Sequence, residues 1–182
     1  MNKFKILIFS FLAISLIACS NETTKEPCLY GEPTPILEKN TEGVSEYTFA
    51  SSDSSGTESA LLTDSLLSEG QIRFTMNQSG CNKVKQVFTF ELPQNDYSTQ
   101  ADSFFVQRAA EGLMVLSQKS STASQSFIPM FAVELNAFAA GVTLNKPLAV
   151  DSKNAPGVFF VITKIATQNE GIITVEFLTV DG

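Results

Sequence analysis

The chain of 182 residues contains no histidine, no tryptophan and only three cysteines. The absence of imidazole excludes Ser-His and Cys-His hydrolysis, imidazole proton shuttling and nearly every catalytic zinc site. The sequence also has no GxSxG elbow, no Ser-x-x-Lys nucleophile, no GxGxxG or GxxxxGK[ST] phosphate loop and no EF-hand loop. We therefore expect no metal, no cofactor and a non-enzymatic role. A hydrolase that uses two carboxylates stays open, because 19 acidic residues are present.

Basic residues are scarce as well, with 12 Lys and Arg against the 19 acids and no run of positive charge. The net charge of −7 argues against nucleic acid as a partner. Phenylalanine is plentiful, with 15 copies, so we expect a core built on its rings.

The one long apolar run lies at the start of the chain. Lys3 and Lys5 precede residues 6–18, which are almost wholly apolar, and the run ends at Cys19. A membrane-spanning helix needs about 20 apolar residues, so this run is too short to cross comfortably. The pattern predicts a secretory signal.

The end of that run carries a motif. Leu16-Ile17-Ala18-Cys19 resembles the lipobox of bacterial lipoproteins. The resemblance implies transfer of diacylglyceryl to the Cys19 sulfur and cleavage before Cys19. In Gram-negative bacteria a third acyl chain follows on the freed amine, and two or three chains hold stably to a membrane. Ser20 follows in place of Asp, which under the sorting rule of these lipoproteins implies an outer-membrane anchor. The body would face the periplasm or the cell surface.

This interpretation sets the domain boundaries. Residues 1–18 are a signal peptide, residues 19–27 a polar tether and residues 28–182 one globular domain. Cleavage leaves 164 residues with 10 basic and 19 acidic side chains, because two lysines leave with the signal; the net charge becomes −9. That length suffices for one domain with a hydrophobic core.

The two remaining cysteines, Cys28 and Cys81, form an even pair in an oxidising compartment, which predicts a disulfide. Closing a loop of roughly fifty residues stabilises a fold by about 4 kcal/mol in the chain-entropy model. A redox-active pair is the alternative, although such cysteines usually lie close in sequence, as in CxxC.

Several segments have strand patterns. In Gln71 to Asn77, Ile72, Phe74 and Met76 alternate with Arg73, Thr75 and Asn77. Lys83 to Leu92 alternates in the same way, with Thr89 and Glu91 on its polar side, so residues 71–92 are expected to form a hairpin. Further strands are predicted at Val44 to Ala50, 157–166 and 172–180. The Ser-rich tracts Ser51 to Ser59 and Ser117 to Ser126 are expected to be surface loops.

Helical spacing follows the hairpin. Thr99 to Asp102 has the form of a capping box, with Thr99 as N-cap. Phe105, Ala109, Leu113 and Leu116 then recur on one face, and Gly112 is expected to weaken this helix by up to about 1 kcal/mol. A second stripe indicates another helix that ends near Gly141, formed by Phe127, Phe131, Leu135 and Phe138. Phe131, Val133 and Leu135 also fit a strand.

These elements predict an α+β domain, an antiparallel sheet of about five strands with one or two helices packed on one face. The predicted role is a periplasmic interaction module that binds another envelope protein. The alternative is a carrier of a small apolar ligand in a pocket lined by Phe105, Phe127, Phe131 and Phe138; simple core packing explains the same residues.

Overall fold

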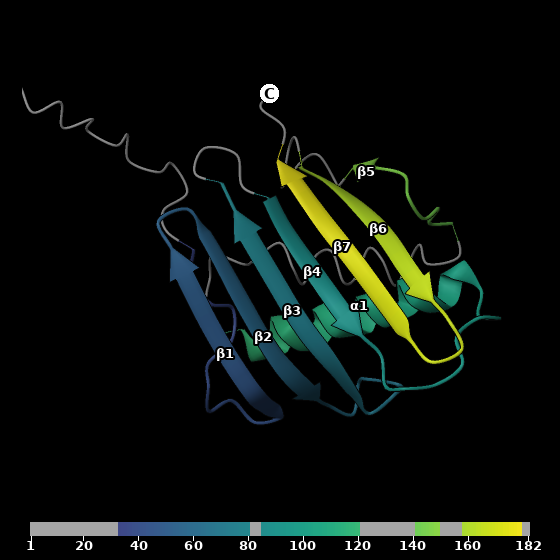
Figure 1. Ribbon diagram of the computed structural model, residues 1–182, viewed down its shortest axis with the longest axis horizontal. Coiled ribbons are helices and arrows are strands. Elements are labelled where there is room, and N and C mark those ends of the chain that lie inside the picture. The colour runs from purple at the N-terminus through teal and green to yellow at the C-terminus, as the bar shows by residue number, and fades with distance from the viewer. Residues whose placement is uncertain (1–32, 81–84, 121–140, 150–157, 180–182) are drawn as a thin grey trace, which may run out of the picture.

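The computed structural model describes residues 33–80, 85–120, 141–149 and 158–179. Its elements follow in the order β1 (Val44–Ser52), β2 (Ser55–Thr63), β3 (Gln71–Ser79), β4 (Lys85–Glu91), α1 (Asp102–Lys119), β5 (Leu148–Ala149), β6 (Val158–Ala166) and β7 (Gly171–Thr179). The strands form one sheet in the order β1-β2-β3-β4-β7-β6-β5, and every neighbouring pair is antiparallel (Figure 1).

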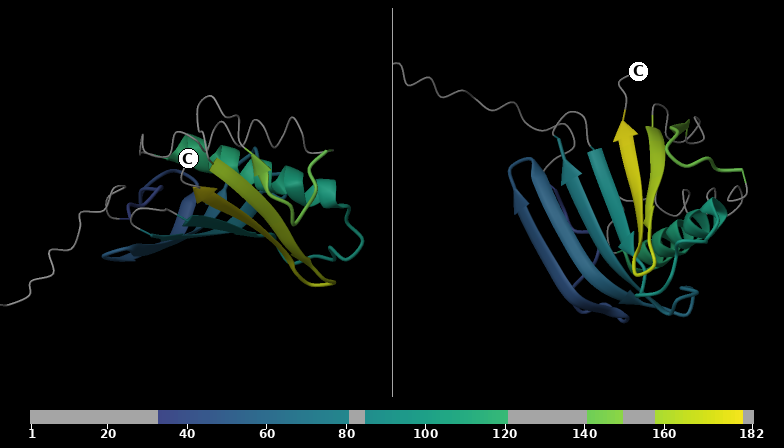
Figure 2. Two further views of the ribbon diagram at one scale, coloured as in Figure 1. Left: turned by 90° about the horizontal axis from the view of Figure 1, so that it is seen from above. Right: turned by 45° about the vertical axis from the view of Figure 1, so that its right-hand side comes forward.

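The sheet and α1 form two layers. Helix α1 lies across one face of the sheet, and in the described part of the chain no helix or strand covers the opposite face (Figure 2). The expected α+β architecture is confirmed at this level. The sheet has six long strands and the two-residue β5, so the expected count of about five was low. The predicted second helix, residues 127–138, lies outside the described residues.

Strand β2 accounts for the low count. The prediction of a surface loop over Ser51 to Ser59 was wrong, because these residues form the end of β1, a two-residue turn and the first half of β2. The inward positions of β2 do alternate, but they include Gly56 and Glu58 before they reach Ala60 and Leu62. A glycine and a carboxylate at buried positions conceal the usual apolar-polar pattern of a strand.

The core lies between the sheet and α1. Phe74, Phe88 and Phe90 have no exposed surface, and Phe74 packs on the other two with ring centroids 6.2 and 6.0 Å apart. From the helix, the four residues expected on the buried face are all fully buried: Phe105, Ala109, Leu113 and Leu116. The phenylalanine-based core is confirmed for the described residues.

Gly112 sits where α1 comes nearest to the sheet. A Cβ atom at this position would lie 2.6 Å from the nearest carbon of the Phe90 ring, well inside van der Waals contact. The glycine that costs helix propensity therefore allows α1 to pack directly on the Phe90 ring.

Helix α1 begins later than its capping box predicted. Its N-cap is Ala101, which makes no side-chain capping hydrogen bond, and Asp102 lies in the first turn. Thr99 is not the cap, because the chain is still in a turn there, closed by Gln100 N donating to the Tyr97 carbonyl oxygen over 3.1 Å. The carboxylate of Asp102, in the first turn, instead interacts favourably with the partial positive charge at the N-terminal end of the helix.

The segment that leads into the domain is fixed by a buried carboxylate. The backbone N–H groups of Ile36 and Leu37 each donate to a different oxygen of Glu58, both over 2.8 Å, and the Tyr47 hydroxyl is also hydrogen-bonded to it. Glu58 has no exposed surface, and this burial raises the pKa of its carboxyl despite the three donors. Burial, with the charge of Glu58, also raises the pKa of Tyr47 to about 12.

Strand β1 forms one edge of the sheet and is irregular. Its register with β2 shifts between Ser45 and Thr48, and Glu46 has a positive φ of 50°. A bulge of this kind bends and twists an edge strand.

Candidate interaction surface

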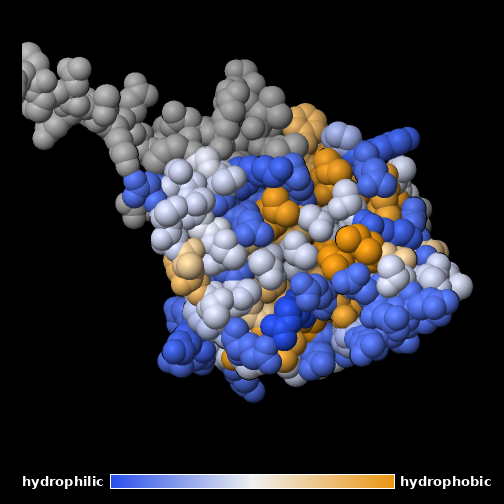
Figure 3. Space-filling view, in the orientation of Figure 1, coloured by the Kyte–Doolittle hydropathy of each residue, from blue (hydrophilic) through white to orange (hydrophobic). Residues whose placement is uncertain are grey.

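The face of the sheet turned away from α1, here called the open face, carries the outward residues of six long strands. Figure 3 shows this face with apolar and polar side chains interspersed. Most of the outward side chains on β6 and β7, and the central ones on β3 and β4, are half-buried by their neighbours. The open face is therefore broad and closely filled.

A row of hydroxyl side chains crosses the open face from strand to strand. The registers place directly opposite one another, in order, Thr48, Ser59, Thr75, Thr89, Thr174 and Thr163. Neighbouring strands lie about 4.8 Å apart, so this hydroxyl row is continuous across the sheet. At its β1 end, the hydroxyls of Thr48 and Ser59 are hydrogen-bonded over 2.7 Å. Such cross-strand hydroxyl pairs stabilise a sheet modestly.

Apolar residues gather on the β4, β7 and β6 side of the open face. Val87, Phe159, Val161 and Ile172 are half-buried there, and Ile165 is 53% exposed. Strand β6 lies next to the short β5, and its outward half contributes to the open face.

The charges of the open face are arranged in pairs. Arg73 on β3 forms an ion pair with Glu46 on β1 at 2.7 Å, and Lys85 on β4 forms one with Glu176 on β7 at 2.9 Å. The hydrogen bond and charge of Glu46, with a smaller effect of Glu91, raise the pKa of the Arg73 guanidinium. The Arg73–Glu46 pair lies on one side of the hydroxyl row and the Lys85–Glu176 pair lies on the other. The row itself carries no charge.

A shallow hollow formed by described residues opens at the end of this face. It has a volume of about 150 Å³ and is lined by Leu61, Gln71, Ile72, Arg73, Glu91, Leu92 and Pro93. Pockets that enclose small molecules usually measure about 300–1,000 Å³. The open face therefore suits contact with another surface better than enclosure of a ligand.

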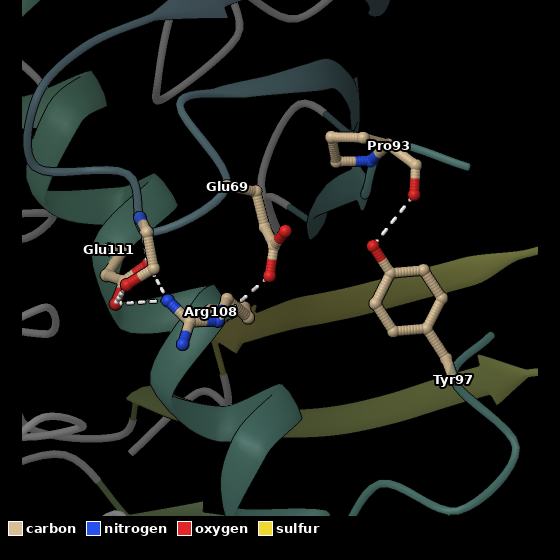
Figure 4. A network of polar contacts seen from close by, with 6 residues as sticks. Glu69, Pro93, Tyr97, Arg108 and Glu111 are labelled. Atoms are coloured by element: carbon tan, nitrogen blue, oxygen red, sulfur yellow. Dashed lines mark hydrogen bonds and ion pairs between the residues drawn. The ribbon is translucent and has the colours of Figure 1, made fainter. Parts of the chain in front are cut away.

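A second polar cluster lies on the opposite side of the molecule, on α1 (Figure 4). Arg108 Nη1 donates to Glu111 over 2.6 Å, and both oxygens of Glu111 accept from Ser68, one from its N–H and one from its hydroxyl. The Arg108 Nε atom is buried and 4.0 Å from Glu69, too far for a hydrogen bond. This cluster fastens the β2–β3 connection to α1, and the Arg108 charge offsets one of its two carboxylates.

Tyr97 packs beside this cluster and helps to seal the end of the core. Its hydroxyl donates to the Pro93 carbonyl oxygen over 2.7 Å, and its ring is 2% exposed (Figure 4). Burial, with the nearby charge of Glu69, raises the pKa of Tyr97. The hydroxyl is thus engaged as a structural donor.

Of the residues expected to be functional, the structure describes one. Phe105 has no exposed surface and packs against Phe104 and Tyr97, with Lys164 Nζ 4.5 Å from its ring centroid. The other candidates lie outside the described residues, so the lipid anchor, the disulfide and the Phe-lined pocket stay predictions: Cys19, Cys28, Cys81, Phe127, Phe131 and Phe138.

The described residues were also searched for metal-binding groups and for membrane-spanning helices. They include no group of three or more Cys, Asp and Glu side chains that could hold a metal ion. No helix in the described ranges is long and apolar enough to cross a membrane. No protein-family model, no curated protein and no solved structure matches the chain.

Sequence patterns located parts of the open face but not the whole. The alternation in β3 and β4 placed Thr75 and Thr89 on polar faces, whereas β2 was missed. Their alignment into one row depends on the pairing register of six strands, which no local pattern specifies.

Proposed function

We propose that this protein is a non-enzymatic lipoprotein, anchored through Cys19 to the outer membrane, whose body binds another envelope protein through the open face. The anchor rests on the lipobox and the apolar run before it. The binding role rests on the open face, which is the single observation that carries it.

Three properties of the open face support a protein partner. It is broad, it combines half-buried apolar side chains with hydrogen-bonding hydroxyls, and its hollow is small for a ligand site. Protein interfaces have this mixture, with an apolar centre and about one hydrogen bond per 100–200 Å². The negative charge of the chain disfavours a polyanionic partner such as nucleic acid.

Site-specific photocrosslinking in intact envelopes tests this role. A photoreactive residue at Val161 on β6 should give a discrete crosslinked product, whereas the same residue at Gln107, on the exposed side of α1, should not. Thr89→Arg, which adds a long charged side chain in the middle of the open face, should abolish the Val161 product. Equal products from Val161 and Gln107, or a product that survives Thr89→Arg, would contradict docking through this face.

The second candidate function is the carriage of a small apolar ligand. One observation favours it: Phe104 and Phe105 form an aromatic pair at the start of α1, the helix that precedes the stretch with Phe127, Phe131 and Phe138. Native mass spectrometry of the full chain, non-reduced and released from mild detergent, would reveal a co-purifying molecule. Its loss in a folded Phe131→Ser variant would move this candidate to first place, and a clean apo mass would remove it.

A further inference from the structure

We propose that the open face is self-complementary and that a second copy of this chain packs on it, the two sheets face to face about a two-fold axis. The inference rests on the proposed function of the open face as a docking surface. It identifies the envelope protein that docks there as a second copy of this same chain. It is carried by the strand registers, which fix where each outward side chain lies relative to every other.

The size of the open face suits a stable pair. Six strands at a spacing of about 4.8 Å span about 24 Å, and nine residues at about 3.4 Å each span about 30 Å. The product is about 700 Å² for each copy, close to the roughly 800 Å² that each partner contributes to a standard protein interface.

The registers define a symmetry line across the sheet. Met76, Phe88, Val175 and Ile162 lie opposite one another in consecutive strands, near the middle of each. A two-fold axis above this line and parallel to it places every strand over its own counterpart, running in the opposite direction. An outward residue on one side of the line then faces, on the same strand of the second copy, the residue that lies the same number of positions from the line on its other side. Packed sheets keep their strand directions within about 30°, which this arrangement allows.

This axis brings opposite charges together. Lys85 and Glu91 lie three residues to either side of Phe88 on β4, so Lys85 of each copy faces Glu91 of the other. The arrangement creates two equivalent intermolecular ion pairs. Lys85 and Glu91 are both exposed in the single copy, and Lys85, which is paired with Glu176 of its own copy at 2.9 Å, would contact Glu91 of the other copy in addition.

The apolar and hydroxyl side chains match as well. On β6, Phe159 faces Ile165 of the second copy, and the most exposed apolar residue of the open face becomes covered. The hydroxyl row faces the next row of outward residues. Thr163 meets Val161, while Thr174 meets the Glu176 carboxylate and Thr75 meets the Asn77 amide, each an acceptor for a hydroxyl donor.

The other two-fold axis, parallel to the strands, matches less well. It would exchange the two sides of the sheet and place Ile165 of β6 opposite Ser45 at the β1 edge. It would also set Phe159 against Ser52, leaving both large apolar side chains without apolar partners. The axis across the strands is therefore favoured.

Charge reversal tests this arrangement. The full chain, kept in mild detergent, is examined by sedimentation velocity from about 1 to 100 µM as wild type, Lys85→Glu, Glu91→Lys and the double variant. We expect a wild-type dimer that each single variant weakens at least tenfold, because both ion pairs become repulsive. The double variant, which restores opposite charges across the axis, should return the dissociation constant to within about threefold of wild type. Glu38→Lys, an equal charge change on the exposed entry segment, should have no effect.

Each other outcome overturns the inference. These are a monomer throughout the concentration range, a dimer that both single variants leave intact, and a double variant that is not rescued. Circular dichroism confirms that each variant is folded, and the rescue separates a surface effect from misfolding. A monomer that still gives the Val161 crosslink to a different protein would refute self-pairing while the proposed docking role stands. The loss of both would refute the two together.

Discussion

The contact between α1 and the sheet depends on Gly112, and we expect Gly112→Ala to destabilise the protein although alanine is the better helix former. Within an isolated helix the change would stabilise by about 1 kcal/mol. In the folded protein, the new methyl carbon would lie 2.6, 2.8 and 3.0 Å from three carbons of the Phe90 ring. Carbon atoms normally stay about 3.5–4.0 Å apart, so the ring or the helix must move by close to 1 Å.

Neither can move without cost. The Phe90 ring has no exposed surface and is 6.0 Å from Phe74 between centroids, while Leu113 and Leu116 fix the helix on the same face. Overpacking a core in this way costs about 1–3 kcal/mol. After the gain of about 1 kcal/mol in helix propensity is subtracted, the expected net loss in the free energy of unfolding is up to about 2 kcal/mol.

Urea denaturation of the full chain, followed by circular dichroism, measures this loss. Gln107→Ala, on the exposed side of the same helix, is the control and should change the free energy of unfolding by less than about 0.5 kcal/mol. Phe90→Leu removes the ring, so adding Gly112→Ala to that variant should cost less than it does alone. An increase in stability from Gly112→Ala in the wild type would refute the reasoning, because the helix would then not depend on glycine for its approach to Phe90.

Glu58→Gln should lower the free energy of unfolding by about 1–3 kcal/mol, because an amide can accept from only one of the two N–H groups of Ile36 and Leu37. Because the folded-state pKa of Glu58 is raised, protonation of its carboxyl stabilises the folded state. This contribution to the free energy of unfolding is full below the usual pKa of a glutamate and is lost as the pH rises through the raised value. Wild-type stability should therefore fall with rising pH over that window, and a titration of Glu58→Gln that shows the same slope would assign the effect to another group. Cys19→Ala should leave uncleaved precursor without label from an alkynyl fatty acid; a normally acylated product would overturn the lipobox interpretation. Cys28→Ser should expose a thiol at Cys81 and lower stability by about 4 kcal/mol, and alkylation of Cys81 in the native wild type would rule out the disulfide.

Much of the fold could be predicted from local patterns. Strands β3, β4, β6 and β7 have alternating or β-branched sequences, and the buried face of α1 follows from apolar spacing alone. Prediction failed where tertiary contacts, and not the local sequence pattern, determined the structure. Glu58 is buried because backbone donors from a segment more than twenty residues earlier satisfy it, so β2 appeared as a polar loop. The start of α1 was placed too early because a turn at Tyr97 replaced the expected side-chain cap.

The candidate interaction surface was less accessible to prediction. Thr75 and Thr89 could be placed on polar faces from β3 and β4, but the row that they join includes residues from β1, β2, β6 and β7. Which residues lie side by side depends on pairings between segments up to about ninety residues apart, as between Lys85 and Leu178. Register of this kind is set by the burial of the whole sheet, so a single sequence carries no local sign of it.

The two edges of the sheet bear on how far copies of this chain can associate. An open strand edge allows sheets to join edge to edge without limit, as in fibrils. Here one edge is the bulged β1, with Glu46 at a positive φ, and the other carries the two-residue β5. Short strands and bulges discourage such joining. The proposed association through the open face, by contrast, buries that face on both copies and leaves none of it free to bind a third copy. With the proposed lipid anchor holding copies on one membrane, this combination would favour closed pairs over open-ended polymers.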